Sequence, residues 1–133
     1  MTQDQKLKYK KRALDYWLKS SQQDWEAAQD LLKSKKYHHA LFFVHLSLEK
    51  LLKAKITEKL EIAPPATHNL NQLVNKITQS TSEQIDQFNE ITKFNLEARY
   101  DDYKLAFYKK ATPEYTLKWF EIATKLTIWI KKI

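Results

Sequence analysis

Apolar residues recur at three- and four-residue steps along most of the chain, which is the spacing of amphipathic helices. The first stretch of this kind covers residues 10 to about 34, and the second covers about 37 to 60. A short third covers about 69 to 78, a fourth carries Ile85 to about Tyr100, and the last runs from residue 112 to the end. The pattern predicts a bundle of about five helices.

Polar and proline-containing segments separate these stretches. Pro64, followed by a second proline, cannot continue the second helix. The segment 80–84 contains capping-box residues for the fourth helix, and Thr112 before a proline marks the start of the last one. Residues 101–111 fit either a helix or a loop.

The last predicted helix is apolar on two sides. One stripe contains Leu117, Phe120 and Ile130, and the other contains Trp119 and Trp129. A helix of this kind is either central in its bundle or shared with a second subunit. A terminal helix is rarely central in so small a bundle, so we expect a homodimer. The alternative is that the second stripe covers a neighbouring helix of the same chain.

The composition supports an all-α, up-and-down bundle in a single domain. The chain has 133 residues and no glycine, and a β-rich protein would lack its usual turn residues. We expect one domain over residues 1–133, with a folded bundle over about 10–132 and a basic leader at 1–9. No apolar run is long enough for a membrane span, and residues 1–12 lack the apolar core of a secretory signal, so we expect a cytoplasmic protein.

The charge and the chemistry-bearing residues limit the possible ligands. A formal net charge of +7 favours a polyanionic partner, although dispersed lysines equally suit a generic basic surface. Cysteine is absent, which excludes disulfides and thiolate catalysis. No glycine-rich phosphate loop and no Glu-x-x-His spacing occur, so we expect no cofactor and no metal.

Arg99 is one of only two arginines among many lysines. Its planar guanidinium pairs bidentately with a carboxylate or a phosphate, which an ammonium group does not do. The stretch around Arg99 therefore predicts either a structural ion pair or a phosphate-binding, and conceivably catalytic, site.

Three groups of residues resemble the HEPN family, over about residues 12 to 130. The second helix carries the family's spacing of apolar and polar positions: Ala40, Phe42, His45, Leu48, Glu49, Lys50, Leu52, Lys53 and Ala54. His68 precedes the apolar Leu70 in the following segment, and Arg99 and Tyr100 form an Arg-Tyr pair with an acid, Asp102, nearby. The resemblance implies an α-helical bundle that dimerises.

The same resemblance implies a set of related functions. Many short members of the family are encoded beside a minimal nucleotidyltransferase, as toxin and antitoxin, and the toxins are metal-independent ribonucleases whose motif has a His a few residues after the Arg. Here the corresponding positions are Lys104, Leu105 and Ala106. We therefore expect a nucleotide- or RNA-binding partner of a nucleotidyltransferase. The alternative is a ribonuclease toxin with a degenerate or relocated site.

The resemblance also places Glu49 opposite the Arg-Tyr segment. We expect an ion pair between Glu49 and Arg99, or a composite polar site that includes His45 one turn earlier. The candidate catalytic residues are Arg99 and His45. The candidate binding residues are Arg99, Tyr100, Asp102, Glu49, Lys50, Lys53 and Lys104. The tyrosines after Arg99 are candidates for base stacking or for nucleotide transfer by the partner.

Overall fold

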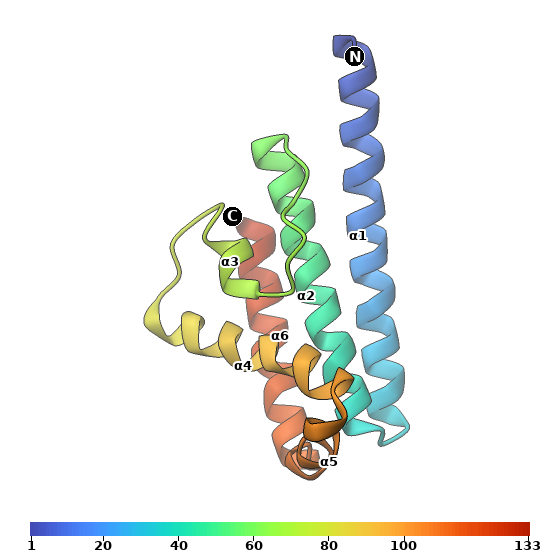
Figure 1. The fold of residues 1–133 in the computed structure, drawn as a ribbon, viewed down its shortest axis with the longest axis vertical. Helices are drawn as coiled ribbons and strands as arrows, with labels where there is room; N and C mark the ends of the chain where they lie inside the picture. Colours follow the sequence, from blue (N-terminus) through green and yellow to red (C-terminus); the bar gives the residue numbers. More distant parts are fainter.

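The computed structural model describes residues 1–133, and it contains six helices and no strands (Figure 1). The expected all-α bundle is confirmed, and the additional helix lies in the segment that the sequence left open. The helices are α1 (Gln3–Lys33), α2 (Tyr37–Leu60), α3 (Leu70–Val74), α4 (Ser82–Arg99), α5 (Asp101–Lys110) and α6 (Pro113–Lys132). None of the six is both long and apolar enough to cross a bilayer.

Helices α1 and α2 form an antiparallel pair with the most extensive contact in the fold. The only buried residues of α1 are Ser21 and Ala28, whose small side chains let the two backbones approach closely. The Ser21 hydroxyl donates a hydrogen bond of 2.7 Å to the Ser47 carbonyl. Helix α1 begins seven residues before the expected position, because Thr2 and Gln5 form a capping box.

Helix α2 is the centre of the bundle. It contacts α1, α3, α4 and α6, and more than half of its residues are buried. Because so many helices surround it, none of its residues from 40 to 57 is fully exposed, and polar residues there have no solvent face. This placement explains why His45, Glu49 and Lys53 are buried although they are polar.

The two apolar stripes of helix α6 pack mainly against other helices of the same chain, which corrects the argument made from them, although the rest of α6 is exposed to solvent. Phe120 packs against Trp25 of α1, with 5.6 Å between ring centroids. Trp119 and Trp129 on the other stripe contact aromatic rings of α4, and Figure 1 shows α6 running beside α2, with α4 crossing it. Both stripes are thus largely covered within the chain, so they no longer indicate a second subunit.

Helix α5 depends on very few tertiary contacts. Phe107 is its only buried residue, and its ring stacks on that of Phe94 at 5.6 Å. At the end of α5, the Lys110 ammonium lies 2.9 Å from Glu97 of α4 and within 6 Å of three aromatic rings. The rest of the helix is exposed, which leaves its tyrosines on the surface.

Candidate functional site

Three polar side chains lie on successive turns of α2. His45, Glu49 and Lys53 are four residues apart, so they share one face of the helix. Their exposed fractions are 0%, 4% and 7%. Polar and charged groups with so little access to water need hydrogen-bond or ion-pair partners within the protein. Those partners define this site.

Glu49 is the centre of this polar cluster. Its Oε2 accepts a hydrogen bond of 2.9 Å from Lys53 Nζ, and its Oε1 accepts one of 2.8 Å from Nδ1 of His68. Burial acts to raise the pKa of Glu49, but the hydrogen bonds from Lys53 and His68 outweigh it, and the pKa lies below its ordinary value. The carboxylate therefore stays ionised and joins α2 to the segment before α3.

His45 is fully buried and holds the same segment from the other side. Its Nε2 lies 2.8 Å from the His68 carbonyl, and since a carbonyl only accepts, Nε2 donates. The Asn95 amide then donates to Nδ1 at 3.5 Å. Burial lowers the pKa of His45, in keeping with a neutral ring. His45 is thus a hydrogen-bonded anchor without access to solvent.

The expected ion pair between Glu49 and Arg99 does not form, so that prediction was wrong. Both Glu49 oxygens are already paired with Lys53 and His68, and no carboxylate lies within 4.0 Å of Arg99. Arg99 is instead the exposed last residue of α4, and its guanidinium carbon lies 5.6 Å from the centre of the Tyr100 ring. Its positive charge still adds to the lowering of the His45 pKa that burial begins.

The other predicted residues separate into two places. Lys50 faces α1, where Nζ lies 2.7 Å from Asp24 and donates to the Ser20 hydroxyl. Tyr100, Asp102 and Lys104 are exposed where the chain passes from Arg99 into α5, and the last two point to different sides of that helix. We call the exposed surface around this turn, from Arg99 to Lys104, the Arg99 face. The structure thus brings His45, Glu49 and Lys53 together and leaves the Arg99 face on the surface.

His68 is the functional candidate that the predicted site lacked. Its side chain is 52% exposed, and its Nδ1 is fixed by the buried Glu49 carboxylate. An exposed imidazole oriented by a carboxylate is an arrangement that general acid–base catalysis uses. The sequence contained a signal for it, since His68 is the loop histidine of the family resemblance. No group of three or more His, Asp and Glu side chains has the arrangement of a metal site.

Comparisons with known proteins give a family from one source and a matching fold from another. The sequence model described as the HEPN domain matches residues 14–133. The crystal structure of TT1696 from Thermus thermophilus superposes with a TM-score of 0.76, over 90% of this chain and 96% of that chain, at 16% identity. At that identity the likeness concerns the fold alone. No curated protein matches the chain significantly.

The buried His45 predicts a specific loss of stability in mild acid. The unfolded chain protonates His45 near its ordinary pKa of 6.5, whereas the folded protein does so only at lower pH. Between those two values the unfolded state binds more protons, so the free energy of unfolding falls as the pH falls through this window. His45→Gln keeps an N–H donor for the His68 carbonyl and cannot titrate there, so it should show a smaller loss.

Urea unfolding between about pH 7.5 and about pH 5.5 measures this loss. His38 is the other histidine whose pKa lies below its ordinary value, through burial and the neighbouring charge of His39, so His38→Gln measures the part of the loss that does not come from His45. If His45→Gln loses as much stability as the wild type over this range, the buried imidazole is not the group responsible.

Proposed function

The chain belongs to the HEPN domain family, and we propose that it binds RNA or a nucleotide at the Arg99 face. In this proposal it acts in the cytoplasm as the partner of a separately encoded nucleotidyltransferase, in a pair of the toxin–antitoxin kind. The proposal of a nucleotidyltransferase partner is based on the family. The proposal of a binding site at Arg99 is based on the position of its side chain.

The observation that carries the proposal is the exposed, unpaired guanidinium of Arg99. A guanidinium that no carboxylate of its own chain occupies can take a phosphate with two parallel hydrogen bonds. The Tyr100 ring beside it is half exposed and offers a surface for base stacking. Lys104 is paired only with the highly exposed Asp101, and such surface pairs contribute little and open readily.

The tyrosines of α5 support the nucleotidyltransferase partner. Tyr100, Tyr103 and Tyr108 are each at least half exposed, on or directly before a helix that buries only Phe107. In the transfer reaction, a phenolic oxygen bonds to the α-phosphorus of a nucleoside triphosphate, its proton passes to a base, and pyrophosphate leaves. A nucleotide added there would cover the Arg99 face, which gives the partner a means of blocking RNA.

Replacing Arg99 should weaken RNA binding. Arg99→Gln removes a charge-assisted contact, which predicts a loss in affinity of about tenfold or more at low salt. Fluorescence anisotropy with a labelled single-stranded RNA, in EDTA and at one fixed salt concentration, measures the affinity.

The matched control for this measurement is Lys93→Gln, which removes one exposed charge from another face of α4. It should bind RNA nearly as the wild type does. Equal affinities for the Arg99 and Lys93 variants would show that binding is only a matter of net charge, and the proposed site would be withdrawn.

The His68–Glu49 contact favours a second candidate function, a metal-independent ribonuclease with a relocated histidine. His68 would take the 2′-hydroxyl proton or protonate the leaving oxygen, and Glu49 would hold its ring in place. Arg99 would stabilise the negative charge that develops on the phosphate. In this second candidate function, His68 from the segment before α3 takes the role of the histidine that is absent after Arg99.

Cleavage of total RNA in EDTA tests the ribonuclease directly. His68→Asn keeps an N–H donor for Glu49 but has no imidazole, so it should lower the cleavage rate by about 10² or more. Unchanged RNA at every protein concentration would rule out the ribonuclease and leave the binding function standing. Cleavage that survives in His68→Asn would point to a contaminating nuclease.

The homodimer that the family implies is also part of the proposal. Exposed apolar residues on α4 and α5 adjoin the Arg99 face, and a second copy would cover them: Leu96 and Leu105. Size-exclusion chromatography with light scattering should give twice the chain mass of 15.9 kDa. A monomer at micromolar concentration would remove the dimer from the proposal.

A further inference from the structure

The N-terminal half of α1 diverges from the end of α2, at the opposite end of the bundle from α5 (Figure 1). The stripe that faces α2 has small residues, Ser21 and Ala28, where the helices are close, and the bulky Trp17 where they separate. A cavity of about 950 Å³ opens there, between the first turns of α1 and the segment after α2. Its size is within the range of small-molecule sites, about 300 to 1,000 Å³. We call this cavity the α1 wedge.

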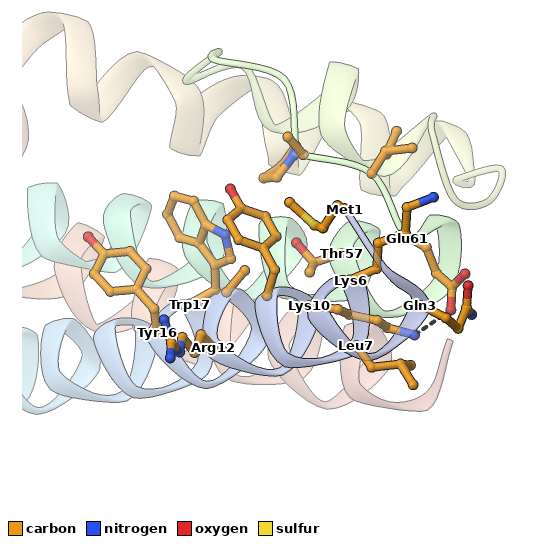
Figure 2. Close-up of a pocket in the computed structure, with 15 residues that line it drawn as sticks. Met1, Gln3, Lys6, Leu7, Lys10, Arg12, Tyr16, Trp17, Thr57 and Glu61 are labelled. Carbon is orange, nitrogen blue, oxygen red and sulfur yellow. Dashed lines mark hydrogen bonds and ion pairs between the residues drawn. The ribbon is translucent and has the colours of Figure 1, made fainter.

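Aromatic rings line one end of the α1 wedge. Tyr16 and Trp17 contact each other edge to face at 5.0 Å, and Figure 2 shows both beside the cavity. Trp17 is half buried, and Lys53 Nζ lies 5.3 Å from its ring centre. Because Lys53 is itself held by Glu49, Trp17 rests on a fixed support. A rigid indole of this kind is a platform on which a flat ring can stack.

Cations surround the same space. Lys6, Lys10 and Arg12 all line the α1 wedge. Lys10 is paired with Glu61 at 2.8 Å, at the other end of the cavity from Tyr16 and Trp17 (Figure 2). Lys6 and Arg12 have no carboxylate within 4.0 Å. The α1 wedge therefore combines an aromatic wall with two positive charges that no acidic group of the chain neutralises.

We propose that the α1 wedge binds a small aromatic anion. The flat ring of the ligand stacks on the aromatic rings of Tyr16 and Trp17, and its phosphate or carboxylate pairs with the guanidinium of Arg12, one helical turn before Tyr16. A purely apolar ligand would leave these cations uncompensated, and a simple inorganic anion would leave the aromatic wall exposed to water. The inference goes beyond the proposed function, because it uses other residues at the other end of the bundle.

Two ligand sources share this chemistry, and calorimetric titration can separate them. Adenosine 5′-monophosphate represents phosphorylated nucleosides, and indole-3-acetate represents aromatic carboxylates. We expect at least one of them to bind the full-length protein at concentrations up to about 1 mM. Adenosine and inorganic phosphate, each carrying half of the recognised chemistry, should bind more weakly than the nucleotide if the nucleotide is the ligand.

Two variants test the site by independent means. Arg12→Gln removes the guanidinium that pairs with the anion, and it should weaken binding about tenfold or more. Lys11→Gln is the matched control, because Lys11 is exposed on the same helix and does not line the cavity. Ala13→Trp fills the cavity without changing its charge and should also weaken binding, provided that circular dichroism shows the helical content retained.

The outcomes separate binding in the α1 wedge from binding elsewhere on the surface. Binding of either probe that Arg12→Gln and Ala13→Trp weaken, and Lys11→Gln does not, supports the proposal and identifies the ligand source. Absence of binding by both probes overturns it, as does equal binding by the Arg12 and Lys11 variants. Binding that depends on Arg99 but not on Arg12 would overturn the α1 wedge and leave the proposed function in place.

Discussion

The buried Glu49 carboxylate, shared between Lys53 and His68, is the interaction on which the rest of the structure depends. A carboxylate with 4% exposure is stable only if its oxygens are hydrogen-bonded, and removing one partner of such a buried pair costs about 3 to 5 kcal/mol. The requirement constrains the neighbouring residues. His68 must stay against α2, and the His68 carbonyl then becomes the acceptor for a neutral His45.

The partners of this carboxylate bear on both candidate binding surfaces. Its hydrogen bonds come from Lys53 and His68 and none comes from Arg99, which lies on the surface beside Tyr100. On the other side, Glu49 holds Lys53 near the Trp17 ring, which forms the aromatic wall of the α1 wedge. One buried charge thus fixes the lysine beside the Trp17 ring, while the Arg99 guanidinium has no carboxylate partner.

The sequence predicted a helix more accurately when more of that helix is buried. The bounds of α2 were predicted correctly, since α2 has a long apolar pattern and prolines follow its end. The pattern did not decide α5, because only Phe107 of its ten residues is buried and its helix depends on contacts with Phe94 and Glu97. The start of α1 was misplaced because residues 3–9 bury nothing, although Thr2 and Gln5 carried a local capping signal.

The sequence by itself determined the helical class, the family resemblance and the polar stripe of His45, Glu49 and Lys53, since these depend on composition and on spacing within a helix. Only the tertiary structure decided which charges meet. His68 lies 19 residues from Glu49 along the chain, and it reaches the carboxylate because the segment before α3 folds back onto α2. Arg99 was the expected partner by charge, but the fold places Lys53 and His68 at the Glu49 oxygens and leaves Arg99 on the surface. Helical periodicity carries no information about which side chains from different segments meet.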